Sequence, residues 1–131
     1  MRRRNIIFLI LFLLYLGLVL FCCFGSFQSL PNVQNEFFGI PTDKLVHFVM
    51  FLPFVFLCYL SFDHLARKPL HAFLLVTACL LAGALMAVAT EVGQSLTSYR
   101  TGDMMDFVAD AAGLAVSTIF LIAILIFIKR E

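Results

Sequence analysis

A small set of charged and amide side chains follows helical spacing in an otherwise apolar chain. Its nine members are Asp43, Lys44, His47, Glu91, Gln94, Arg100, Asp103, Asp106 and Asp110. Carboxylates and an imidazole held together can transfer protons or exchange hydrogen bonds with a ligand. Because apolar surroundings make such groups costly unless they are paired or used, we take these nine residues as the candidate functional cluster.

The first three members precede an apolar run. Asp43 and His47 are four residues apart and Lys44 and His47 are three apart, so the side chains can share one helix face. Asp43 follows Pro41 and Thr42, a pattern typical of a helix N-terminus, where the helix dipole favours a carboxylate. Capping does not account for His47, one turn deeper. An amphipathic filler and a functional imidazole are both open for this residue.

Glu91 and Gln94 continue a stripe of small residues that includes Gly83 and Ala87. Small residues let neighbouring helices approach closely, so the stripe predicts that Glu91 faces into a bundle. A charged Glu91 there needs a cation; Arg100 and Lys44 are the candidates on that side, and the pair with Arg100 is the one we expect. A structural pair and a functional pair are both open.

The last three members follow the same pattern. Asp103, Asp106 and Asp110 are spaced i, i+3, i+7, and Gly113 and Ser117 extend the stripe. Asp103 and Asp106 can cap and complement a helix start. Asp110 lies about 10 Å deeper along the helix than Asp103, at 1.5 Å per residue. Its carboxylate must therefore be neutral, paired or reached by water. The chain contains no HExxH or similar strong metal motif, and we expect no metal and no cofactor.

Four long apolar runs must position these groups. Hydrophobic residues make up 63% of the 131 residues and charged residues 13%, against about 25% charged residues in soluble domains. Since a span needs about 20 apolar residues, the chain is predicted to be one all-α domain over 1–131, a four-helix transmembrane bundle. The predicted spans are about 6–24, 45–62, 72–96 and 103–128. Pro53 should kink the second.

Lysine and arginine are unevenly distributed between the loops. Seven lie on one side: Arg2, Arg3, Arg4, Arg67, Lys68, Lys129 and Arg130. Only Lys44 and Arg100 lie on the other. Because cytoplasmic loops are enriched in these residues, both termini are expected in the cytoplasm and the cluster at the outer face of a bacterial inner membrane. The expected partner is the lipid bilayer; no pattern indicates nucleic-acid binding or an oligomeric state.

The order of the cluster residues resembles the VanZ-like family of small bacterial membrane proteins. The matching elements are Asp43-Lys44-x-x-His47-Phe48, Glu91-x-x-Gln94, Arg100, Asp103-x-x-Asp106 and Asp110-x-x-Gly113, over roughly residues 40–117. The family is named for a member linked to low-level resistance to the glycopeptide teicoplanin, so the resemblance implies a cell-envelope role. The chain departs from the family at Asp110, where Asn is common, and at Ser117, where Gly is common.

Three kinds of function fit this sequence. The preferred one is an outward-facing acidic site for a lipid head group, a peptidoglycan precursor or a glycopeptide, in which Lys44 and Arg100 meet an anionic group. Glu91, Asp106 and Asp110 would supply hydrogen bonds or proton transfer. A membrane-embedded hydrolase or transferase acting on a lipid-linked substrate would use the same groups, although no activated Ser or Cys is evident. A small proton-coupled transporter is the third, and enzymatic activity is left undecided.

Reporter fusions test the expected orientation. Fusions after Leu30 and Ser98 should report the exported side, and fusions after Arg67 and at the C-terminus the cytoplasm, because lysine and arginine favour the inside. Paired alkaline phosphatase and fluorescent-protein fusions measure both sides. A cytoplasmic signal after Ser98 would place the cluster on the opposite face.

Overall fold

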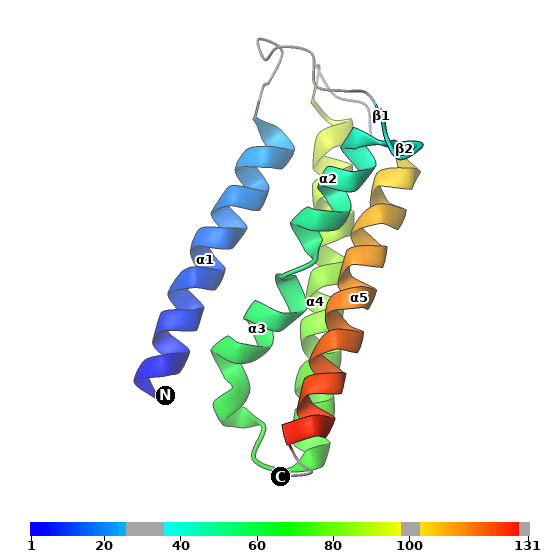
Figure 1. Cartoon of the computed structure of the whole chain (residues 1–131). Coiled ribbons are helices and arrows are strands. Elements are labelled where there is room, and N and C mark those ends of the chain that lie inside the picture. Colours follow the sequence, from blue (N-terminus) through cyan, green and yellow to red (C-terminus); the bar gives the residue numbers. More distant parts are fainter. Residues whose placement is uncertain (26–35, 98–102, 129–131) are drawn as a thin grey trace.

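The computed structural model describes residues 1–25, 36–97 and 103–128. Its helices stand side by side as an elongated bundle (Figure 1). The first is α1, Arg3–Phe24; the second span consists of α2, Thr42–Phe51, then α3, Phe54–Phe62, and the 3₁₀ turn η1, Asp63–Leu65. The remaining helices are α4, Pro69–Ser95, and α5, Met104–Ile128. The start of α1 and the end of α5 lie at the same end of the bundle.

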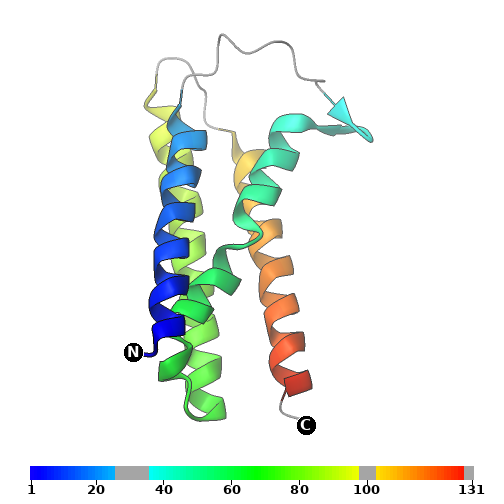
Figure 2. The same ribbon diagram turned by 60° about the vertical axis from the view of Figure 1, so that its left-hand side comes forward.

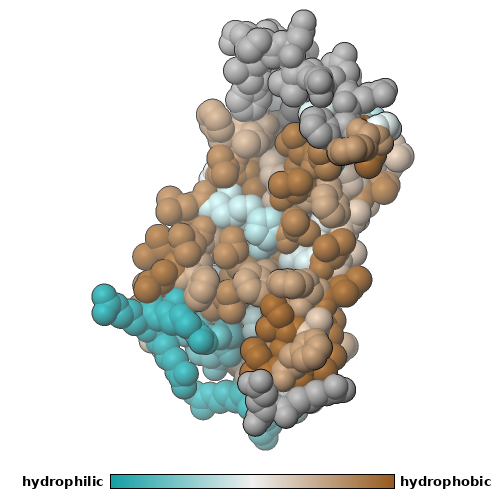
Figure 3. All heavy atoms as spheres, viewed as in Figure 1, coloured by the Kyte–Doolittle hydropathy of each residue, from teal (hydrophilic) through white to brown (hydrophobic). Residues whose placement is uncertain are grey.

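Four segments are long and apolar enough to cross a membrane: Arg3–Phe24, Thr42–Leu65, Pro69–Ser95 and Met104–Ile128. They confirm the predicted four-span helical bundle; the side of the membrane on which the termini lie stays a prediction. Large apolar side chains cover the outside of the helices (Figure 3), and Leu14, Leu81 and Ile119 are each more than 60% exposed. Such a surface suits contact with lipid rather than water.

A short antiparallel pair of strands adds a non-helical element that the sequence did not predict. The strands are β1, Glu36–Phe37, and β2, Ile40–Pro41. The turn between them has positive φ at Phe38 (52°) and Gly39 (78°). Two successive positive φ angles are typical of a tight hairpin turn, and glycine accepts this conformation readily whereas phenylalanine rarely does.

Pro53 breaks the second span. Proline has no N–H to donate to the preceding helical turn, and α2 ends at Phe51 while α3 begins only at Phe54. The predicted kink is therefore confirmed as a complete break. The hydroxyl of Tyr15, in α1, donates a hydrogen bond to the carbonyl oxygen of Met50 beside the break. Because the span is broken at Pro53, α2 lies along α5, whereas α3 crosses towards α1 (Figure 2).

A polar latch fastens the start of α1 to the end of α3. Asn5 is fully buried, and its Nδ2 donates hydrogen bonds to the carbonyl oxygen of Leu60 (3.0 Å) and to Oδ1 of Asp63 (2.5 Å). Arg4 forms an ion pair with the other oxygen of Asp63. Buried polar groups need such partners, so the latch fixes where α1 packs on α3.

The small residues predicted to face inward do lie between helices. A Cβ on Gly113 would be 2.5 Å from the carbonyl oxygen of Phe48 and 3.2 Å from the amide nitrogen of Leu52. Helices α2 and α5 therefore approach each other closely at this glycine. In α4, Gly83 and Ala87 are buried as the stripe predicted.

Replacing Gly113 by alanine should destabilise the bundle. The added methyl group would meet the rigid backbone of α2, and overpacking of this kind costs about 1–3 kcal/mol. We expect a lower midpoint of thermal unfolding in detergent micelles for Gly113→Ala. Gly17→Ala is the matched control, because nothing lies within 4 Å of its Cβ position. Equal midpoints for the two variants would contradict the close approach.

Candidate functional site

Lys44 lies at the centre of a group of carboxylates where α2 and α5 begin. Its Nζ is 2.5 Å from Oδ2 of Asp103 and 2.5 Å from Oδ1 of Asp106, both from the α5 side. It is also 3.0 Å from Oδ2 of Asp43, in the first turn of α2. An ammonium has three hydrogens, and the three carboxylates can use all of them. Lys44 therefore ties α2 to α5, and it has no spare donor for the anionic ligand expected from the sequence.

His47 extends this network into the bundle. Its Nδ1 is 2.9 Å from Oδ1 of Asp110, and its Nε2 is 3.6 Å from Oδ2 of Asp106. His47 is 3% exposed and Asp110 is fully buried. Since an isolated buried charge is costly, a shared proton between imidazole and carboxylate is the favourable arrangement. The spacing predicted the helix face on which each of these residues lies, and the structure brings the two faces together at the interface of α2 and α5.

Two carboxylates bind the start of α5. Oε1 of Glu91 accepts a hydrogen bond from the amide of Asp103, and Oδ1 of Asp103 accepts one from the amide of Met105 at 2.9 Å. These contacts use N–H groups that a helix leaves free at its N-terminus. The hydrogen bond from Lys44, aided by that from Met105, holds the pKa of Asp103 below its ordinary value, so this carboxylate is ionised at neutral pH.

Gln94 does not join the central network. Gln94 is buried, and its Nε2 donates a hydrogen bond to the carbonyl oxygen of Cys23 at 3.0 Å, which fastens α4 to the end of α1. Arg100 lies outside the described residues, so its expected pairing with Glu91 stays a prediction. The described network thus contains Asp43, Lys44, His47, Asp103, Asp106 and Asp110, with Glu91 at its edge.

Some buried oxygens of this region accept no hydrogen bond within the described part of the chain. They are Oδ2 of Asp110, Oε2 of Glu91 and Oγ of Ser117. Leaving a buried acceptor without a donor costs free energy. The network therefore has capacity for further hydrogen-bond donors even though its own cations are fully engaged.

The three aspartates around Lys44 also have the spacing of cation ligands. One oxygen from each of Asp43, Asp103 and Asp106 lies within 4.8 Å of the others, and hard divalent cations prefer such oxygens. The Lys44 ammonium, however, bonds to the same three carboxylates. The three carboxylates therefore already bind a cation, the ammonium group of Lys44.

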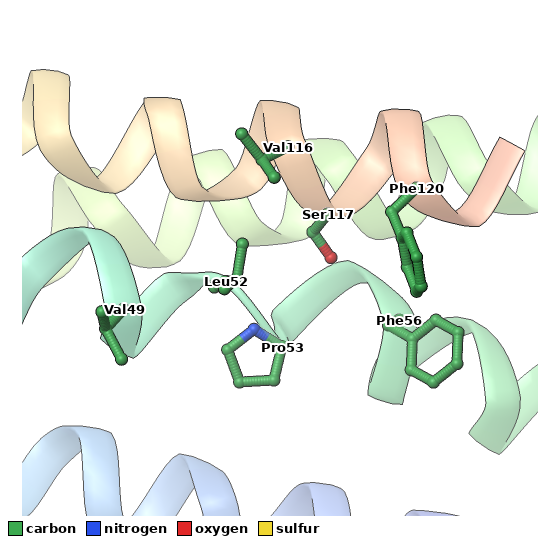
Figure 4. A pocket seen from close by; sticks show the side chains of 7 residues that line it. All are labelled: Val49, Leu52, Pro53, Phe56, Val116, Ser117 and Phe120. Carbon is green, nitrogen blue, oxygen red and sulfur yellow. The ribbon is translucent and has the colours of Figure 1, made fainter. Parts of the chain in front are cut away.

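An apolar recess follows the polar network along the same pair of helices. It has a volume of about 520 Å³ and is lined by Val49, Leu52, Pro53, Phe56, Val116, Ser117 and Phe120. Figure 4 shows the break at Pro53 facing α5, from which Ser117 points towards the second span. Along α5, Gly113, where α2 approaches closely, lies between Asp110 and the recess-lining Val116. The sequence did not predict this recess, although it did predict the interruption at Pro53, which lines the recess.

Substitutions at Asp110 test the buried pair with His47. Asp110→Asn keeps the shape and an oxygen or amide for His47 Nδ1, so we expect near-normal thermal stability and membrane abundance. Asp110→Leu removes the hydrogen bond and should lower the free energy of unfolding by about 1–3 kcal/mol. Thermal unfolding in detergent measures both variants.

Val108→Leu provides the control for the Asp110 variants. Val108 is on the same helix but 49% exposed, so added apolar volume there should leave stability unchanged. Full stability of Asp110→Leu would show that the His47–Asp110 contact contributes nothing to the fold.

Comparison with known proteins identifies the family of this chain. A family profile described as VanZ/LLP1 matches residues 7–128, nearly the whole chain. No curated protein and no solved structure gave a match. The match includes all four membrane-spanning helices and the polar network between α2 and α5. The chain therefore belongs to the VanZ/LLP1 family.

Proposed function

We propose that the polar network is an outward-facing site for the head group of a cell-envelope amphiphile. The observation that carries the proposal is the combination, along one pair of helices, of a carboxylate-rich network and an apolar recess. Lipid head groups, peptidoglycan precursors and glycopeptides such as teicoplanin are the candidate ligands. Membership of the VanZ/LLP1 family supports a role in the membrane.

The charges of the site favour a ligand that donates hydrogen bonds. Among the described residues of the site, five carboxylates (Asp43, Glu91, Asp103, Asp106 and Asp110) stand against two basic groups (Lys44 and His47). Because Lys44 is surrounded by carboxylates, the unused capacity consists of acceptors. Hydroxyl and amino groups, as on sugars or ammonium-bearing heads, complement such acceptors.

The recess would take the apolar chain of the same molecule. Asp106 and Ser117 are eleven residues apart on α5, about 16 Å along the helix at 1.5 Å per residue. A head group at Asp106 would thus place an acyl or polyprenyl chain beside Val116 and Phe120. These two side chains are 46% and 60% exposed, so the recess is reachable from the lipid.

Binding fits the geometry better than hydrolysis or group transfer. His47 could act as a general base only through a ring nitrogen within reach of the substrate, yet both of its ring nitrogens face carboxylates and the side chain is almost fully buried. A proton path through the protein also lacks support. Beyond Ser117, the buried residue in the described part of α5 is Leu121, whose apolar side chain cannot carry a proton. No specific observation favours either the enzyme or the transporter.

Photo-crosslinking in native membranes tests the proposal. A photoreactive residue replacing Val49, in the recess, should capture an amphiphile with a sugar or amino head group, identified by mass spectrometry. The same residue replacing Leu81, which is 64% exposed on α4, should capture bulk phospholipid only. Asp106→Asn should lower the specific adduct by about tenfold, since a hydrogen bond to a charged group contributes about 1.5–3 kcal/mol.

Membrane abundance of each variant serves as the control for folding. Identical adducts at Val49 and Leu81 would contradict a specific site. Teicoplanin added before illumination separates the ligand classes: loss of the adduct would place the glycopeptide at this site, and an unchanged adduct would favour an endogenous envelope lipid.

A further inference from the structure

A second polar pocket lies at the opposite end of the bundle. It has a volume of about 540 Å³ and is lined by Met1, Arg2, Arg4, Asp63, His64 and Arg67. Its walls come from the start of α1, from η1 and from the segment leading to α4. Figure 3 shows the hydrophilic surface of this end at the lower left. No cluster residue from α2 or α5 contributes to it.

The lining of this pocket has an excess of positive charge. Among the described residues that line it, Asp63 is the one acidic residue, and both oxygens of Asp63 are engaged, one by Arg4 and the other by Asn5. Three arginines against one aspartate leave a formal surplus of two charges. The Arg4–Asp63 pair positions the pocket, and Arg2 and Arg67 supply the charge that no lining carboxylate neutralises.

We propose that this pocket binds the phosphate of an anionic membrane lipid. Guanidinium groups present paired N–H donors that match phosphate oxygens and bind them bidentately. The pocket lies at the ends of membrane-spanning helices, the depth at which lipid phosphates are found, and basic pockets at such positions recognise anionic head groups. Arg2 and Arg67 are the binding residues.

A bound phosphate would also stabilise the contact between α1 and the second span. Arg2 precedes α1, and Arg67 follows η1. One phosphate held by both would act across the same junction as the Asn5–Asp63 latch. The proposal is independent of the ligand at the α2/α5 network, because the two sites share no residue.

Native mass spectrometry of the full chain in detergent tests this site. With dioleoylphosphatidylglycerol as the probe, we expect the wild type to retain one lipid, and dioleoylphosphatidylcholine to be retained much less. Arg2→Gln and Arg67→Gln should each lower the retained fraction about tenfold, the effect of losing a charge-assisted hydrogen bond. Arg3→Gln and Lys68→Gln are matched controls, because these neighbours carry the same charge but do not line the pocket.

Each outcome decides the proposal. An equal loss in the lining variants and their neighbours would overturn it, since general attraction would then account for binding. No loss in Arg2→Gln and Arg67→Gln, with thermal midpoints unchanged, would overturn it too. Millimolar inorganic phosphate separates the sources of phosphate: retention of phosphate without phosphatidylglycerol would assign the pocket to a free ion and overturn the lipid site.

Discussion

The membrane-spanning part of this chain can carry buried carboxylates because Lys44 and His47 lie among them. Lys44 bonds to aspartates on both sides of the α2/α5 interface, and His47 pairs with Asp110 inside it. Uncompensated charges at this depth would be costly. These contacts therefore set the position of α2 along α5, and the close approach at Gly113 follows from that position.

The break at Pro53 allows the two halves of the second span to make contacts in different directions. The first half of the span must stay on α5 to keep Lys44 and His47 with their aspartates, whereas the second half packs on α1 and is held there by Asn5. A continuous helix would have to bend to do both; proline ends the hydrogen-bond pattern at the required point. The change of direction leaves the apolar recess beside α5. The polar network and the recess thus both depend on the course of the second span, which follows α5 up to Pro53 and then turns towards α1.

The lengths of the apolar runs predicted the four spans, Pro53 predicted the interruption of the second, and helical spacing predicted the faces on which His47 and Asp110 lie. Each of these depends on the local sequence of one span. The backbone partners that Glu91 and Gln94 have in the structure were not predicted, because a repeat indicates the face of a side chain but not the neighbour that it meets. Gln94 bonds to Cys23, which is 71 residues away, and Glu91 bonds to a backbone amide that has no sequence signature. The positive φ at Phe38 was also beyond prediction, since local propensity opposes it.

The two ends of the molecule use ion pairs in opposite ways. At one end, a single lysine is surrounded by acids, so the pairs that hold α2 to α5 leave an excess of acceptors. At the other, a single aspartate is surrounded by arginines, and the pair that holds α1 to η1 leaves an excess of donors. In both cases the ion pairs that hold the helices together engage the charged group of the less abundant sign, Lys44 at one end and Asp63 at the other. The two ligands proposed here, a donor-rich head group at the α2/α5 network and a lipid phosphate at the arginine-lined pocket, each complement the more abundant charge of the described residues at that end.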